Sequence, residues 1–282
     1  HAEHPEILAR AAAEAAALDP AAASTHEAAR PAAAEALAVA QLLTMNIEAG
    51  AKLHVAHVTS TTTLDVLRRF AGSSDFSAAT CPQYLRHTAE DVARVGVYGK
   101  VNPPIRTAAD RDALWDAIAD GTLAHVTTDH TSFTAAEKAA HEGDFLDAPP
   151  GHPGTELLLP TLLDGVAEAR LTLPQVAELV SGAAARRFGL PDRGVLAEGA
   201  RADLTLVYLD GETAPSEANL RTAARHVARL AWGQRYRGRV AATFLAGVPI
   251  FDGSDVVAVP GSGRFVRPAA QHRVGAGAGG RS

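Results

Sequence analysis

The chain has 282 residues, of which 47% are hydrophobic and 21% are charged, and its formal net charge is −6. This composition supplies a sizeable core and excludes a chain that is disordered throughout. The negative charge disfavours nucleic acid and anionic membranes as partners, and no stretch reaches the ~18 uninterrupted apolar residues of a membrane-spanning helix. A single cysteine, Cys81, excludes an internal disulfide framework and indicates a reducing compartment, so we expect a cytoplasmic protein.

Helical and strand-like segments alternate over residues 1–192. Each expected strand is a short apolar run, and the helices have apolar spacing or begin at a capping residue. This alternation is typical of a parallel sheet with crossover helices, so we predict an α/β fold. In chain order the segments are helices at 5–18 and 31–48, a strand at 52–58, a helix at 63–70 after Ser60, an apolar stretch at 76–81, a short helix from 88, a helix at 108–120 after Thr107, a strand at 123–128, a loop at 130–154, and helices at 155–168 and 173–187.

After Gly194 the pattern changes to an alternation with a period of two. Residues 203–208, 240–245 and 248–251 alternate in this way, and Gly247 stands where a hairpin turn needs a glycine. We therefore predict a small β domain at 193–268, followed by a disordered, glycine-rich tail at 269–282. At the other end the sequence begins with His1 and not with methionine, so we expect a processed or truncated piece of a longer chain.

Two predicted strands end at residues that can bind a metal. His57 ends the strand LHVAH, and Asp129 follows the strand AHVTT. Functional groups collect at the carboxyl ends of parallel strands, and imidazole with carboxylate suits Zn²⁺ or a similar ion. A regular strand would point His54 and His57 to opposite faces, so we prefer His57, which is nearer the carboxyl end. The structural alternatives are a hydrogen-bonded histidine at His57 and a turn cap at Asp129.

Two further residues are weaker candidates. His1, just before a helix, is a third site residue if a strand precedes it. Cys81 with a histidine would form a nucleophilic pair, which is the alternative to metal chemistry. A small buried residue before a proline explains Cys81 without such a role.

Seven strings along the chain resemble those of the cyclic amidohydrolases, the group that contains dihydroorotases, allantoinases and hydantoinases (dihydropyrimidinases). They occur in the family's order over about residues 1–268, and they are HAEHPEI, LHVAHVTS, CPQYL, KVNPPIR, TTDHTSF, GHPGTELLLP and GVLAEGARADLTLV. The resemblance implies a distorted (β/α)₈ barrel of the TIM type with a two-metal centre, usually zinc. It also implies a small β domain built from both chain ends.

The resemblance assigns roles to three candidate metal residues. His1 of HAE matches the ligand after strand five, and His57 of AHVTS matches the ligand after strand six. Asp129 of TTDH matches the aspartate after strand eight, which binds the other metal and acts as general base.

The resemblance also assigns roles in substrate binding. Asn102 of KVNPPIR lies where the family contacts the substrate ring, and Pro150 and Gly151 fall in the loop whose backbone holds that ring. Phe133 stands where dihydroorotases of the most similar type have a histidine, which favours a hydantoinase- or allantoinase-like substrate. Ala79 stands where many relatives have Glu.

Two motifs of the resembled family are absent from the sequence. They are His-x-His after strand one and the carboxylated lysine of strand four, a place that Lys52, Lys100 and Lys138 do not occupy. A full barrel needs roughly 250 residues. We therefore expect residues 1–192 to be the carboxyl-terminal part of a barrel, starting at the end of strand five.

The sequence thus predicts a metal-dependent hydrolase that opens the cyclic amide bond of a small ring of hydantoin, dihydropyrimidine, allantoin or dihydroorotate type. We expect two zinc ions, or other divalent metals, and a homo-oligomer in the complete protein. The alternative is a truncated, non-catalytic fragment without the N-terminal ligands, or a dihydroorotase-like pseudoenzyme. Open sheet edges in such a fragment are expected to expose apolar inner faces, such as Leu53 and Val55.

Overall fold

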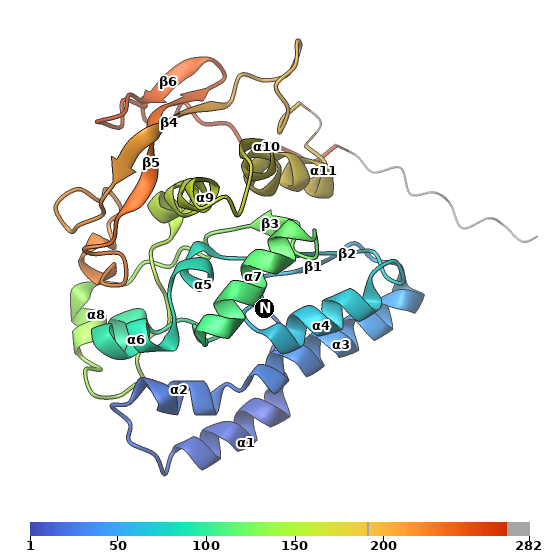
Figure 1. Ribbon diagram of the computed structural model, residues 1–282, viewed down its shortest axis with the longest axis vertical. Helices are drawn as coiled ribbons and strands as arrows, with labels where there is room; N and C mark the ends of the chain where they lie inside the picture. Colours follow the sequence, from blue (N-terminus) through green and yellow to red (C-terminus); the bar gives the residue numbers. More distant parts are fainter. Residues whose placement is uncertain (191, 270–282) are drawn as a thin grey trace, which may run out of the picture.

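Two three-stranded sheets organise the chain (Figure 1). The computed structural model describes residues 1–190 and 192–269, so the expected tail lies outside the described residues from residue 270 onward. The parallel sheet has the order β1-β2-β3, and the antiparallel sheet has the order β4-β5-β6. The strands are β1 (Leu53–Val55), β2 (Phe76–Thr80), β3 (His125–Val126), β4 (Leu204–Thr213), β5 (Tyr236–Leu245) and β6 (Val248–Phe251).

Helices connect and cover the strands of the parallel sheet, as the α/β prediction requires (Figure 1). The α-helices are α1 (Pro5–Ala15), α2 (Ala23–Ala29), α3 (Ala32–Ala49), α4 (Thr61–Phe70), α5 (Pro82–Arg86), α6 (Ala89–Val95), α7 (Ala108–Ala119), α8 (Ala135–Ala139), α9 (Leu158–Ala167), α10 (Leu173–Ala177) and α11 (Ala183–Phe188). Shorter helical turns are η1 (Gly96–Gly99), η2 (Thr155–Leu157), η3 (Glu178–Gly182) and η4 (Arg225–Val227).

Capping residues begin two helices where the sequence predicts. The Ser60 hydroxyl accepts a hydrogen bond from the Thr63 N–H (3.2 Å) at the start of α4. The Thr107 hydroxyl accepts one from the Asp110 N–H (3.2 Å) at the start of α7. Each cap satisfies a backbone N–H that has no partner within its helix.

Several expected elements differ from the observed ones. The strand expected at 52–58 is only three residues long, the loop expected at 130–154 contains α8, and a π-helical turn, η3, interrupts the helix expected at 173–187. Helices α2 and α5 were not expected. Both are short, with seven and five residues, so neither shows enough turns for a helical period to be read.

One face of the parallel sheet packs on the helices. Val55, Ala78 and Val126 are buried in the main apolar cluster, together with side chains of α4 and α7. The expectation that Val55 lies on an exposed inner face is therefore wrong, because Val55 is 4% exposed and Leu53 packs partly buried against the same cluster. The alternation of β1 turns His54 to the opposite face of the sheet.

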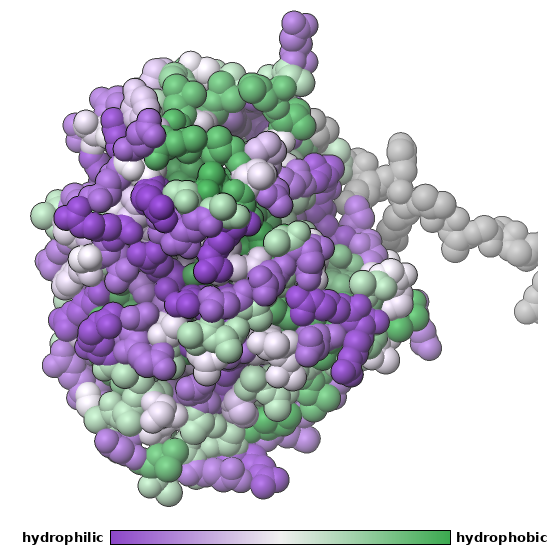
Figure 2. All heavy atoms as spheres, in the orientation of Figure 1, coloured by the Kyte–Doolittle hydropathy of each residue, from purple (hydrophilic) through white to green (hydrophobic). Residues whose placement is uncertain are grey.

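The antiparallel sheet contacts the rest of the protein through α9 (Figure 1). Asp164 on α9 accepts hydrogen bonds from Arg86 Nη1 (2.7 Å) and from the Arg237 N–H of β5 (3.1 Å). Figure 2 shows apolar side chains gathered at the top of the view, over this sheet. Leu206 of β4 and Val248 of β6 are both more than half exposed. Among the described residues, no helix is long and apolar enough to cross a membrane.

Candidate active site

The carboxyl ends of β1 and β3 carry two of the expected site residues. His57 stands two residues beyond β1, and Asp129 stands three residues beyond β3. Both have a positive φ, 40° at His57 and 45° at Asp129. This conformation is unfavourable for residues other than glycine and persists only where the surroundings impose it, which is common at functional sites.

His1 lies against His57. His1 Nδ1 is 3.2 Å from His57 Nε2, and the ring centroids are 4.9 Å apart in a T-shaped arrangement. On its other side, His1 Nε2 is 2.8 Å from a carboxylate oxygen of Glu3. Glu3 thereby fixes the ring so that Nδ1 faces His57. The structure thus brings together two of the three expected metal ligands.

Glu3 is an unexpected member of the site. Its side chain is fully buried and also pairs with Arg30. Burial acts to raise the pKa of Glu3, but the hydrogen bond from His1 and the charge of Arg30 lower this pKa overall. Glu3 therefore stays a carboxylate. The string HAE contained this residue, but only the fold shows that it reaches back to His1.

Burial and the neighbouring His1 lower the pKa of His57, while the charge of Asp129 acts in the opposite direction. His57 is 7% exposed, whereas Asp129 is exposed to solvent. Asp129 is therefore close enough to influence His57 electrostatically. The low pKa favours the neutral imidazole, which is the form that binds a metal.

A buried polar network that the sequence analysis missed supports the segment after His57. The Thr59 N–H donates to Glu35 Oε1 (3.0 Å), and Arg106 Nε donates to the Thr59 hydroxyl (2.9 Å). Arg106 Nη1 also donates to the Arg30 carbonyl (3.2 Å). Burial raises the pKa of Glu35. The only signal in the sequence was a glutamate among the apolar residues of an expected helix.

The expected substrate residues lie on two segments that contact each other. Asn102 Oδ1 is buried and has no hydrogen-bond partner among the described residues, so it is an available acceptor. The Gly151 N–H donates to the Lys100 carbonyl (2.8 Å). A Cβ at Gly151 would lie 2.6 Å from Cβ of Thr131, so this loop packs closely on the segment that follows Asp129.

The described residues hold no group of three or more His, Cys, Asp or Glu side chains that could bind a metal ion. They supply the His1–His57 pair, with Asp129 nearby. Cys81 is buried, and burial raises the pKa of its thiol, so it is a neutral thiol and not an activated nucleophile. The Cys–His alternative is therefore disfavoured.

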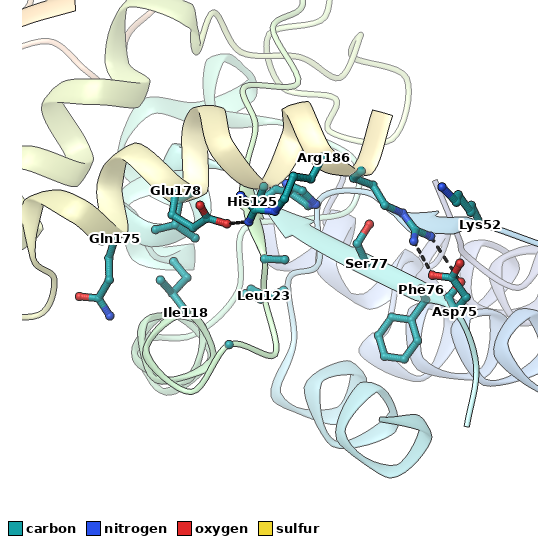
Figure 3. Close-up of a pocket in the computed structure, with 15 residues that line it drawn as sticks. Lys52, Asp75, Phe76, Ser77, Ile118, Leu123, His125, Gln175, Glu178 and Arg186 are labelled. Carbon is teal, nitrogen blue, oxygen red and sulfur yellow. Dashed lines mark hydrogen bonds and ion pairs between the residues drawn. The ribbon is translucent and has the colours of Figure 1, made fainter. Parts of the chain in front are cut away.

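A pocket of about 620 Å³ lies at the opposite, amino-terminal end of the parallel strands (Figure 3). Phe76, Ser77 and His125 line it from the sheet. Both arginines that line it are paired, Arg186 with Glu178 and Arg187 with Asp75. Functional groups of parallel barrels gather at the carboxyl ends, so this pocket is not the candidate active site.

Residues 10–247 match the amidohydrolase family, and the chain belongs to this family. It is 39% identical over 244 residues to an allantoinase of Rubrobacter xylanophilus. These aligned residues cover 86% of this chain and 52% of the relative. It is also 37% identical over 177 residues to a dihydroorotase of Halobacterium salinarum. These aligned residues cover 63% of this chain and 40% of the relative.

The fold is also similar to solved hydantoinases. A structure of D-hydantoinase superimposes with a TM-score of 0.89 at 30% identity, covering 96% of this chain and 61% of that one. The chain thus spans about half the length of the curated relatives it matches. The resemblance to cyclic amidohydrolases predicted from the seven strings is confirmed.

Proposed function

We propose that this chain is the carboxyl-terminal portion of a metal-dependent hydrolase that opens the ring of a small cyclic amide. Residues 1–192 would form the late strands and helices of the barrel, and residues 193–268 a small β domain. The observation that carries the proposal is the His1–His57 pair, with a 3.2 Å separation of facing nitrogens and Glu3 holding the outer nitrogen of His1. The names of the relatives favour this hydrolase over a non-catalytic fragment or a pseudoenzyme.

The spacing of the two histidines fits a shared metal ion. Two nitrogens bound to one tetrahedral zinc at 2.0–2.1 Å lie about 3.3 Å apart, and His1 Nδ1 and His57 Nε2 are 3.2 Å apart. Metal-binding histidines commonly donate their other ring N–H to a carboxylate, as His1 does to Glu3. We infer that these histidines hold one zinc ion and that Asp129 holds a second.

Asp129 is the proposed general base. When bound, divalent ions polarise a carbonyl and lower the pKa of a water molecule. Asp129 accepts a proton from the water that attacks the ring carbonyl carbon, and passes it to the ring nitrogen as the C–N bond breaks. The second proton of the water is released when the new carboxyl group ionises, so the products are a carboxylate, an uncharged amide or ureido nitrogen and one proton, and water is the only co-substrate.

Asn102 and the loop at 150–151 are the proposed ring contacts. The free Asn102 Oδ1 can accept a hydrogen bond from a ring N–H. The Gly151 N–H is already used by the Lys100 carbonyl, so this loop offers the ring its backbone carbonyl groups. Phe133 cannot donate a hydrogen bond to a substrate carboxylate, which favours uncharged hydantoin- or allantoin-type rings over dihydroorotate.

The remaining metal ligands are proposed to come from outside this chain. Two histidines and one aspartate are fewer than the three or more ligands that each zinc ion normally has. The greater length of the relatives leaves room for the missing ligands. We further propose a cytoplasmic homo-oligomer, in keeping with the single buried Cys81 and with the complete barrel expected of the whole protein.

The test is Asp129→Asn in the complete, zinc-loaded protein, assayed on allantoin, hydantoin and dihydroorotate. Loss of the base is expected to lower kcat about 10²–10⁴-fold on each accepted ring, because the nearly isosteric amide cannot take the proton. Asp255→Asn is the control, since Asp255 is 80% exposed on the antiparallel side. A rate for Asp129→Asn within threefold of wild type would overturn the assignment.

A further inference from the structure

Lys138 is the most deeply buried of the chain's three lysines. Its side chain, on α8, is fully inaccessible, and no carboxylate pairs with it among the residues that the structure describes. A buried ammonium group without a counter-ion is costly unless hydrogen bonds replace its hydration. Such a residue therefore needs a structural or functional reason.

Three backbone carbonyls take the place of water around this ammonium group. Lys138 Nζ donates to the carbonyls of Pro149 (2.7 Å), Val97 (3.1 Å) and Lys100 (3.4 Å). The nitrogen also lies 5.6 Å from the centre of the Phe133 ring, within cation–π range. An ammonium group has three N–H donors, so these acceptors use its full capacity.

The three carbonyls belong to the two segments that carry the proposed ring contacts. Lys100 stands two residues before Asn102, and Pro149 directly precedes Pro150 and Gly151. The Lys100 carbonyl accepts from both the Lys138 ammonium and the Gly151 N–H. One buried charge thus ties together the two segments that carry the proposed ring contacts.

We propose that Lys138 is a positioning residue that fixes the separation between the Asn102 segment and the loop at 149–151, and so holds the ring-binding groups in place. The role in ring binding rests on the proposed function, whereas the clamp between the two segments does not. Lys100 cannot replace it, because within the described part of the chain its ammonium group donates only to the Leu146 carbonyl (2.8 Å). Arginine or histidine side chains have flat donor geometries that do not match three converging carbonyls.

The first test compares amide hydrogen exchange in the 282-residue chain and in Lys138→Met. Methionine keeps an unbranched, flexible side chain and removes all three donors. Burial, followed by the charge of Lys100, lowers the pKa of Lys138 to about 7, so exchange is measured at pH 6, where the ammonium form prevails. The protection of the Gly151 amide is expected to fall about tenfold or more, since its local opening free energy drops.

Two matched lysine variants serve as controls. Lys52→Met alters an exposed residue and is expected to leave Gly151 protection unchanged. Lys100→Met removes a single hydrogen bond to a different carbonyl and is expected to change Gly151 less than Lys138→Met does. Unchanged protection in Lys138→Met, or an equal loss in Lys100→Met, would overturn the clamp.

A measurement on the wild-type chain covers the case in which Lys138→Met does not fold. Acetic anhydride is expected to modify Lys52 fastest and Lys138 slowest, because the Lys138 amine is buried and fully hydrogen-bonded. Mass spectrometry of the digested protein gives the three rates. Equal labelling of Lys138 and Lys52 would contradict the proposal, and this result needs no catalytic activity.

The role in ring binding has its own readout. In the complete, zinc-loaded protein, Lys138→Met is expected to raise KM for allantoin or hydantoin about tenfold while kcat changes less than about threefold, because a displaced binding loop weakens ground state and transition state alike. A fall in kcat with KM unchanged would exclude the positioning role. Absence of hydrolysis in the wild type would refute the proposed function and leave the exchange and labelling results to decide on the clamp.

Discussion

The parallel and antiparallel sheets differ in burial and in the residues they carry. In the parallel sheet, Ala78, Ala79 and Thr80 of the central strand are inaccessible to solvent. In the antiparallel sheet, Leu206 is 53% exposed and Tyr208 is 56% exposed. The expected metal ligands His57 and Asp129 follow strands of the parallel sheet only. The buried sheet is therefore the one whose strand ends carry the candidate site residues.

The deeper burial of the parallel sheet explains how residues with a strained backbone conformation persist at the candidate site. His57 and Asp129 keep a positive φ, which costs of order 1–3 kcal/mol at each position. Packing and hydrogen bonds around the parallel sheet, including the Glu35–Thr59–Arg106 network, offset that cost. The antiparallel sheet is instead joined to the rest of the protein by Asp164 of α9, whose carboxylate pairs with Arg237 of β5 and with Arg86 of α5.

Matched leucine truncations give the largest expected contrast between the two regions. Leu64→Ala, under the parallel sheet at 0% exposure, is expected to lower the free energy of unfolding by about 2–5 kcal/mol, because it removes buried methyl groups and leaves a cavity. Leu206→Ala on the antiparallel sheet is expected to cost under ~0.5 kcal/mol. Urea denaturation of both variants measures this, and similar losses would contradict the contrast.

The pH dependence of stability gives a second test of this contrast, because His26 of α2 and His152 are buried and both lie outside the antiparallel sheet. Burial is the main cause that lowers the pKa of His26 to about 4 and that of His152 to about 3. Between pH 6.5 and 4 the unfolded chain therefore binds more protons than the folded one, and stability falls as the pH falls. From pH 6 to pH 5 the two histidines are expected to remove about 2 kcal/mol from the unfolding free energy.

Histidine variants separate this effect from other titrations. His26→Gln is expected to reduce the stability loss between pH 6 and pH 5 by about 1 kcal/mol, because one of the two protonations is then absent. His226→Gln, at a side chain that is 44% exposed on the antiparallel side, is expected to leave the loss unchanged. An unaltered pH slope in His26→Gln would show that this residue is accessible in the folded protein.

Removal of a helix cap gives the smallest expected effect on the parallel region. Thr107→Ala deletes the hydroxyl that accepts the Asp110 N–H at the start of α7. The loss is expected to be about 1 kcal/mol, below that of Leu64→Ala, because the freed N–H can bind water. Thr107→Ser keeps the acceptor and is expected to stay within a few tenths of a kcal/mol of wild type. Thermal denaturation of the pair checks the order.

Much of the local structure follows from the sequence alone. Ser60 and Thr107 begin helices where predicted, because a side-chain oxygen at these places satisfies a backbone N–H within three residues. The strands near residues 53–55 and 125–126 and the hairpin at Gly247 are signalled by short apolar runs and a glycine. These features depend on near neighbours in the chain, so the sequence contains their signals. The family also follows from the order of its seven short strings.

Only the tertiary structure decided which side chains meet. The pairing of His1 with His57 spans 56 positions, and Glu3, Arg30, Glu35 and Arg106 join the site from segments that show no common pattern. The same holds for Lys138, whose three carbonyl partners lie 11 to 41 positions away. Local propensity records the conformation of a segment, whereas the partners of a buried charge depend on how distant segments pack. Burial then makes those partners obligatory, because an unpaired charge or polar group in the core is too costly to persist.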